Sequence, residues 1–156
     1  MRIHLIAISH RRAGWEQDGF REYARRMPPE LSLELHEIAP SKRRKRSPAE
    51  RCVEDEGRRL VAAVPGSARV VALDERGSRW TTLELANRIE RWMHDGRDVA
   101  LLVGGADGLA PACIEAAEHR WSLSPLTLPH GLARIVVAEQ LYRASTIIRR
   151  HPYHRA

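Results

Sequence analysis

Long apolar stretches are missing from this chain of 156 residues. A membrane-spanning helix needs about 20 consecutive apolar residues, and no run approaches that length. Residues 1–10 carry one arginine and a short apolar run, without the small-residue cleavage site of a signal peptide. We therefore expect residues 3–8 to form a first β-strand, and we expect a soluble, cytoplasmic protein with no membrane partner.

Cysteine pairs and ordered histidine patterns are missing as well. Cys52 and Cys113 are the two cysteines, and they lie far apart without a C-x-x-C spacing, so we expect both to be reduced. The eight histidines form neither H-x-x-x-H nor H-E-x-x-H. The sequence therefore predicts no metal.

Lysine is almost absent, because Lys42 and Lys45 are the only two and arginine supplies the remaining positive charge. The formal net charge of +6 favours an anionic partner, and nucleic acid is the commonest one. Arginine richness alone is weak support, since a GC-rich genome also favours arginine codons. The run Lys42–Arg46 is either a solvated loop or a loop that contacts phosphate.

What is present is a composition of 43% hydrophobic and 29% charged residues, which is that of a globular protein. Neither a repeat nor a linker divides the chain, so we expect a single domain over residues 1–156.

Apolar periodicity predicts alternating strands and helices. The expected strands are 3–8, 31–39, 68–74 and 98–104, and the expected helices are 15–27, 48–64, 81–96, 111–121 and 131–150. In the first helix the inward residues are predicted to be Trp15, Phe20, Tyr23 and Met27. We expect a turn at 75–80 and a short strand or extended loop at 122–128. This alternation favours an α/β fold with a mostly parallel sheet and helices on both faces, but it does not fix the strand order.

A glycine cluster, Gly104-Gly105-Ala106-Asp107-Gly108, follows an apolar strand and precedes a helix. Ligands of open α/β sheets bind beyond the carboxyl ends of strands. The spacing is neither G-x-G-x-x-G nor that of a phosphate-binding P-loop. The cluster is therefore either a tight turn or a place where a ligand lies against bare backbone.

Three further segments are candidates for chemistry. "LSPLTLPHG" at 123–131 is either a connecting loop or an extended edge that reads an adenine. Glu139 and Arg143 have the i,i+4 spacing of a helix pair, and an acid inside so apolar a helix needs a partner. The tail "HPYHRA" at 151–156 is either a disordered terminus or a cluster of proton-transfer and phosphate-binding groups.

Over its whole length the chain resembles the RlmH family of SPOUT-class methyltransferases. The resemblance rests chiefly on "LLVGGADGL", "WSLSPLTLPHGLARIVVAEQLYRA" and "HPYHR", with support from "FREYARR", "VALDERG" and "DEGRRL". Ser9-His10 departs from the family, in which glycine and a polar residue commonly follow the first strand, and Pro125 occupies a variable position.

The resemblance implies a fold whose C-terminal part forms a trefoil knot, a rare exception to unknotted connections. It also implies S-adenosyl-L-methionine as methyl donor, and N3 of a pseudouridine in the bacterial 23S ribosomal RNA as acceptor, within the large subunit or the 70S ribosome. A homodimer is implied, in which the tail of one protomer reaches the cofactor pocket of the other. The implied cofactor-binding residues are Leu73, Gly104, Leu123, Ser124, Pro125, Leu126, Thr127 and Leu128.

The acceptor N3–H must lose a proton, so a general base is expected. The candidates are His130, Glu139, Tyr153 and His154, and we favour His154 or a neighbouring tail group. We expect Arg143 and Arg155 to hold the RNA phosphate or the base, and Tyr153 to stack on the target base.

Two other functions are compatible with the residues alone. A non-catalytic basic protein that binds RNA or the ribosome would account for the net charge and the basic loop. A doubly wound nucleotide-phosphate enzyme would bind its ligand at residues 104–108.

Overall fold

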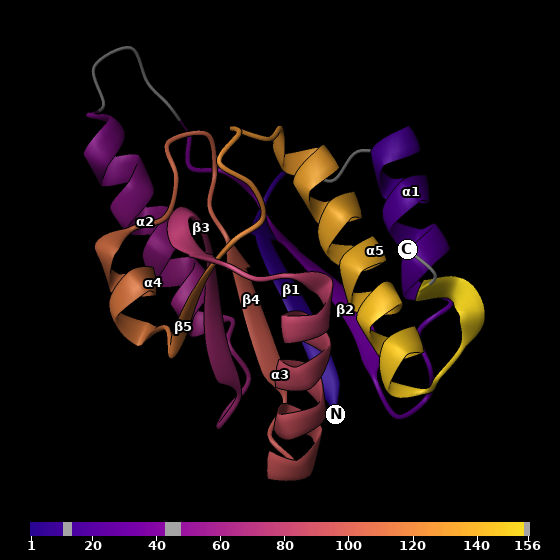
Figure 1. Cartoon of the computed structure of the whole chain (residues 1–156). Coiled ribbons are helices and arrows are strands. Elements are labelled where there is room, and N and C mark those ends of the chain that lie inside the picture. The colour runs from indigo at the N-terminus through magenta and orange to yellow at the C-terminus, as the bar shows by residue number, and fades with distance from the viewer. Residues whose placement is uncertain (11–13, 43–47, 155–156) are drawn as a thin grey trace.

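The computed structural model describes residues 1–10, 14–42 and 48–154. Its sheet has five strands, all parallel to their neighbours, and their order across the sheet is β2-β1-β4-β3-β5 (Figure 1). The strands are β1 (Arg2–Ile8), β2 (Ser32–Ile38), β3 (Arg69–Arg79), β4 (Val99–Val103) and β5 (His119–Ser122). The helices are α1 (Trp15–Ala24), α2 (Ala49–Ala62), α3 (Thr82–Asp95), α4 (Pro111–Ala116) and α5 (His130–Ile148), followed by the short 3₁₀ helix η1 (Pro152–His154). The α/β fold with a parallel sheet is thereby confirmed. The C-terminal knot stays a prediction.

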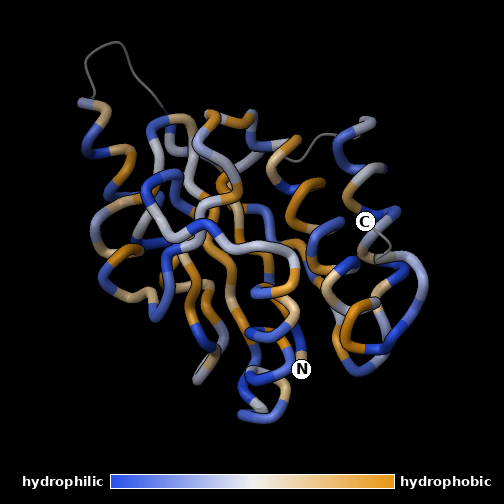
Figure 2. Tube along the Cα trace, viewed as in Figure 1, coloured by the Kyte–Doolittle hydropathy of each residue, from blue (hydrophilic) through white to orange (hydrophobic). Residues whose placement is uncertain are grey.

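Helices cover both faces of the sheet, and each face has its own core (Figures 1 and 2). Side chains alternate between the faces along β1, as strand geometry requires. Leu5 packs with residues of α1, α3 and α5, whereas Ile6 packs with residues of α2 and α4. Cys52 and Cys113 are both free and buried.

Helix α3 begins and ends where its capping residues predict. The Thr81 hydroxyl accepts a hydrogen bond from the backbone N–H of Glu84, whose carboxylate accepts one from the backbone N–H of Thr81. This reciprocal capping box begins the helix. Gly96 ends it in the left-handed conformation, with a φ of 80°.

The expectation for α1 is only partly confirmed. Phe20 is buried, and Tyr23 and Met27 are partly buried against the same core. Trp15, however, is 66% exposed, so its predicted inward position is wrong. It is the first residue of the helix, where the chain enters α1.

Two predicted boundaries near the third strand are wrong. The turn expected at 75–80 does not end the strand, because β3 continues to Arg79 with a shift in its pairing to β5 between Leu73 and Ser78. The helix expected at 111–121 ends at Ala116, and the last residues of that range form β5 instead. Pairing with β3 and the stacking of Trp121 on Trp80 outweigh the local helical pattern.

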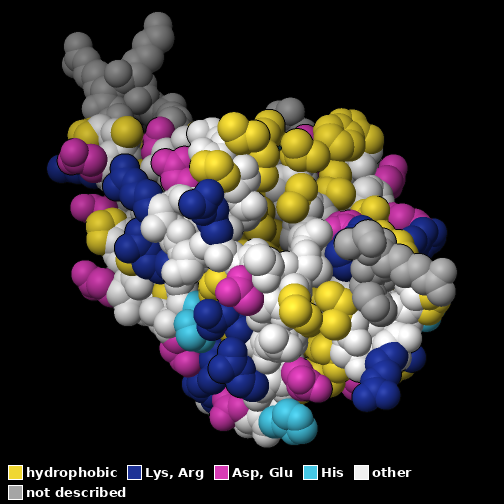
Figure 3. Space-filling model, in the orientation of Figure 1, with side chains coloured by type: hydrophobic (Ala, Val, Ile, Leu, Met, Phe, Trp, Pro, Cys, Tyr) yellow, Lys and Arg dark blue, Asp and Glu magenta, His cyan; other side chains and the backbone are white. Residues whose placement is uncertain are grey.

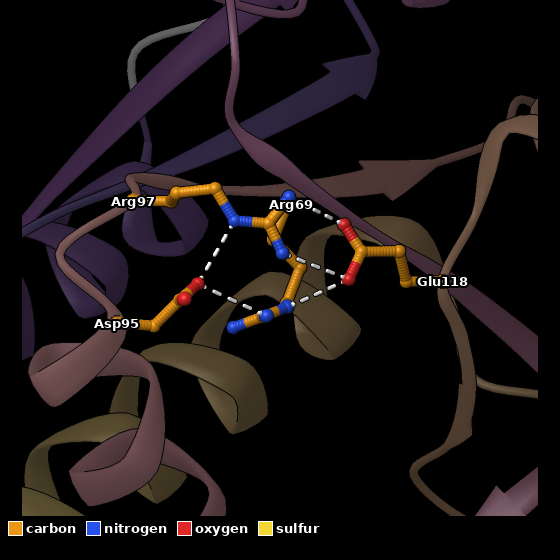
Figure 4. A network of polar contacts seen from close by, with 4 residues as sticks. All are labelled: Arg69, Asp95, Arg97 and Glu118. Atoms are coloured by element: carbon orange, nitrogen blue, oxygen red, sulfur yellow. Dashed lines mark hydrogen bonds and ion pairs between the residues drawn. The ribbon is translucent and has the colours of Figure 1, made fainter.

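An ion-pair network closes the amino-terminal edge of the sheet (Figure 4). Arg69 at the start of β3 contacts Asp95 and Glu118, and Arg97 contacts the same two carboxylates. The network joins the end of α3 to the segments that lead into β4 and β5. None of the helices in the described parts of the chain is both long and apolar enough to cross a bilayer.

Candidate active site

A cavity of about 710 Å³ lies at the carboxyl-terminal side of three adjacent strands, β4, β3 and β5. Small-molecule sites usually have volumes of about 300–1,000 Å³. Of the residues predicted to bind a cofactor, the cavity is lined by Leu73, Gly104, Leu123, Ser124, Leu126, Thr127 and Leu128. Pro125 is the one member of that set that does not line it.

The glycine wall of the cavity is a tight turn that also leaves backbone exposed. Gly108 has a φ of +85° and donates its N–H to the carbonyl of Gly105 over 3.0 Å. A Cβ at Gly104 would collide with the backbone of Gly108 and Leu109. The interpretation of this cluster as a tight turn is therefore confirmed, and the turn lines the cavity, whereas a ligand against its backbone stays a prediction.

The opposite wall is the loop at 123–128. The Ser122 hydroxyl donates to the carbonyl of Ser124 over 3.1 Å, and the Ser124 hydroxyl accepts the N–H of Leu126 over 3.0 Å. These bonds fix the bend of the loop without a regular element. Leu126 is 70% exposed, so this apolar side chain stands at the rim of the cavity.

Charged groups line the cavity where β3 loses its regular pairing. Asp74 accepts two hydrogen bonds from Arg120, over 3.1 Å to Nε and 2.5 Å to Nη2. Desolvation opposes ionisation of Asp74, but the backbone N–H of Arg76 and the Arg120 guanidinium hold its pKa below the usual value. Sequence reasoning missed this pair, although Asp74 lies within the "VALDERG" segment that carried the resemblance.

Of the three predicted catalytic residues whose side chains the structure describes, His130, Glu139 and Tyr153, only His130 lines the cavity. It is the first residue of α5. Arg134, one turn further along the helix, is buried and donates to Glu37 at the end of β2 over 2.9 Å. This bond fixes the start of α5 beside the carboxyl ends of the strands.

Glu139, Arg143 and Tyr153 form a second cluster away from the cavity. Arg143 donates from Nε to Glu139 over 2.8 Å, and its guanidinium lies 4.8 Å from the centre of the Tyr153 ring. The Tyr153 hydroxyl donates to the same Glu139 oxygen over 3.4 Å. Burial, together with the hydrogen bond to Tyr23, raises the pKa of Tyr153 to about 12. Glu139, the acid within the apolar helix α5, thus has Arg143 as the partner that a desolvated carboxylate requires.

The tail folds back onto its own helix, beside α1 and α5 (Figure 1). Glu139 lies nine positions after His130 on α5, a rise of about 14 Å along the helix axis. Within one chain, therefore, the tail cluster does not join the cavity. The side chain of His154, the residue Arg155 and most of the basic run Lys42–Arg46 lie outside what the structure describes.

Comparison with known proteins defines the class first. The family model described as "Predicted SPOUT methyltransferase" matches residues 1–154. The chain therefore belongs to the SPOUT methyltransferases, and it is an enzyme that transfers methyl groups, which confirms the resemblance found in the sequence.

Particular relatives narrow this class. The protein named ribosomal RNA large subunit methyltransferase H of Nitrosococcus oceani is 53% identical over 156 residues, which cover 100% of this chain and 99% of that protein. The protein of the same name from Burkholderia mallei is also 53% identical and is covered completely. A solved structure described as a putative methylase family protein from Neisseria gonorrhoeae shares the fold, with a TM-score of 0.51 and 18% identity over 90% of this chain and 80% of that one.

Proposed function

We propose that this chain methylates N3 of a pseudouridine in the 23S ribosomal RNA of the large subunit, with S-adenosyl-L-methionine as methyl donor. The observation that carries the proposal is the three-walled cavity formed by Leu73, Gly104 and the loop at 123–128. The relatives that are 53% identical bear the name of a large-subunit ribosomal RNA methyltransferase.

The cavity suits this donor better than a nucleotide with phosphates. The backbone of the turn at 104–108 lines the cavity, and the apolar side chains of Leu73 and Leu128 supply surfaces against which a flat ring packs. The glycine spacing is not that of a phosphate cradle. The bound donor supplies a methyl group that is already activated on a cationic sulfonium.

The residues of the chain then have to orient the acceptor and remove its proton. Orientation of the two reactants is worth about 7–11 kcal/mol at best. Among the candidate bases whose side chains the structure describes, His130 is the one that lines the cavity. Tyr153 is poorly suited to that role near neutral pH, because its raised pKa keeps the phenol protonated.

A homodimer would complete the site. The tail carries Tyr153 and His154 but folds outside the cavity of its own chain. Apolar side chains gather along the upper rim of the face in Figure 3, and Trp15, Leu126 and Leu132 are among the exposed large hydrophobic residues. Burial of these side chains against a second copy would bring a partner's tail to the cavity.

The decisive experiment combines two measurements. Tritiated S-adenosyl-L-methionine should label 23S RNA in ribosomes from a strain that lacks the modification, and calorimetry should show that the donor binds. Deletion of residues 151–156 should abolish labelling and spare most of the donor binding. Absence of labelling with intact donor binding would refute the proposed substrate.

The alternative, a non-catalytic basic protein, makes the opposite prediction. It requires salt-dependent binding of RNA that the methyl donor does not affect and that leads to no label transfer.

A further inference from the structure

Three side chains that the proposed function does not use lie together on strands β1 and β2. His4 of β1 pairs in register with Glu34 of β2, and Ile6 pairs with His36. Because side chains alternate along a strand, His4, Glu34 and His36 project from the same face of the sheet. This is the face that α2 and α4 cover further along, since Ile6 packs in their core.

The potential ligand atoms of these residues form a small triangle. Nδ1 of His4 lies 3.0 Å from Nε2 of His36, and each of these nitrogens lies 3.7 Å from Oε2 of Glu34. A triangle with these sides has a centre about 2.0 Å from every corner, which matches the bonds that Zn²⁺ forms to imidazole nitrogen and carboxylate oxygen. The three atoms are therefore spaced as the ligands of one ion are spaced.

A second observation concerns Nε2 of His4, the ring nitrogen that points away from Glu34 and His36. The His4 side chain is only 5% exposed, and its Nε2 is buried without a hydrogen-bond partner among the described residues. The nearest carboxylate oxygen, Oδ2 of Asp98, lies 3.6 Å from that nitrogen. Asp98 is itself held by the backbone N–H of Arg2 over 2.7 Å and by its Nε over 3.1 Å. A carboxylate behind a histidine is the arrangement that orients metal-bound imidazoles in proteins.

We propose that His4, Glu34 and His36 bind one late first-row divalent metal ion, such as Zn²⁺. Two imidazoles and one carboxylate are the donor set that these metals prefer. Glu34 and His36 are exposed, so a water molecule has access to the fourth coordination position. The site lies outside the cavity, and the ion would tie the edge strand β2 to its neighbour β1.

The sequence predicted no metal because the expected patterns place two histidines on one helix. Here only Glu34-Leu35-His36 lies within one segment, and the third ligand comes from a strand about 30 residues earlier, which the parallel register brings alongside. The competing explanation is a hydrogen bond between the two imidazoles over 3.0 Å, with no ion required.

Titration of Zn²⁺ into the metal-free protein, prepared without a histidine tag, distinguishes the two explanations. A chromophoric chelator in competition gives the stoichiometry and the affinity. We expect one ion per chain, and we expect His36→Ala and Glu34→Gln each to weaken binding at least tenfold. Both side chains are exposed, so the variants should keep the fold, which circular dichroism checks. His94→Ala, at an exposed histidine of α3, is the matched control and should leave binding unchanged.

Two spectroscopic and thermal readouts sharpen the result. Co²⁺ in the same site should give the intense visible absorption of a four-coordinate ion, and His36→Ala should abolish it. Zn²⁺ should raise the melting temperature of the parent protein and not that of His36→Ala, because a ligand stabilises only the state that binds it. Substoichiometric binding, or equal affinity in the parent protein and His36→Ala, would overturn the proposal in favour of a simple histidine pair. Loss of methyl transfer does not enter this test, so its outcome is separate from that of the proposed function.

Discussion

The guanidinium of Arg134 on α5 and the carboxylate of Glu37 at the end of β2 form a buried pair, with Nη1 and Oε1 2.9 Å apart. The two side chains are only 9% and 11% exposed. The hydroxyl of Ser9 donates to the same Glu37 oxygen over 2.7 Å. Ser9 thus supplies the carboxylate with another hydrogen bond beside that of Arg134. The pair links the helix that begins at the cavity to the edge strand of the sheet.

Replacement of Arg134 by Met should destabilise the protein by about 3–5 kcal/mol, because it leaves the Glu37 carboxylate buried without its partner. Urea denaturation measures the change. Glu37→Gln in the Arg134→Met background should recover part of the loss, since the unpaired charge is then gone. Arg91→Met, at an exposed arginine of α3, should change stability by less than about 0.5 kcal/mol. Equal losses in the two arginine variants would contradict the role given to the pair.

Gly104→Ala should abolish donor binding. The added methyl group has no room, because the backbone of Gly108 and Leu109 occupies its place and a backbone segment cannot rotate away. Isothermal titration with S-adenosyl-L-methionine measures the effect, and thermal unfolding shows how much of it comes from lost stability. Gly14→Ala is the control, since nothing lies within 4 Å of the added Cβ. Donor binding in Gly104→Ala equal to that of Gly14→Ala would exclude this glycine from the cofactor wall.

Much of the sheet could be predicted from the sequence, because central parallel strands are continuous apolar runs. The segments Ile3–Ile8 and Val99–Val103 are of this kind, and each lies within or forms an observed strand. The cap of α3 was equally visible, since Thr81, Glu84 and Gly96 act through bonds to near neighbours. Signals that depend only on the local chain were thus sufficient for these elements.

Apart from the exposed Trp15, the features that the sequence did not predict arise from contacts between distant segments. His119–Ser122 becomes a strand only because β3 lies beside it, and no pattern within those four residues shows this. The Asp74–Arg120 contact and the His4–His36 contact likewise join residues of different strands. The walls of the cavity were predictable through the family resemblance, whereas the separation of Tyr153 from the cavity depends on how the tail folds back onto α5.

The network in Figure 4 should make stability depend on acid pH. Hydrogen bonds from Arg97 are the main cause that holds the pKa of Asp95 and of Glu118 below the ordinary values. A carboxylate with a lowered pKa contributes stability that is present above its unfolded pKa and is lost as the pH falls through its folded pKa. The difference in unfolding free energy between the parent protein and Glu118→Gln should therefore be largest near neutral pH and should shrink towards acid pH. A difference that does not change with pH would show that Glu118 contributes through packing and not through charge.

Tyr153 should titrate later than an ordinary tyrosine. Burial, the hydrogen bond to Tyr23 and the charge of Glu139 raise its pKa from 10.0 to about 12. Because the neutral phenol is favoured in the folded chain, this contribution to stability is present below pH 10 and is lost as the pH rises through 12. The tyrosinate absorbance of the parent protein minus that of Tyr153→Phe should therefore show its midpoint well above 10, provided that both proteins remain folded. The ring of Tyr142 lies 4.7 Å from that of Tyr153, and Tyr142→Phe removes only the Tyr142 hydroxyl, so this variant tests whether the late titration belongs to Tyr153 itself. A midpoint at or below 10 would mean that the tail cluster does not shield the phenol.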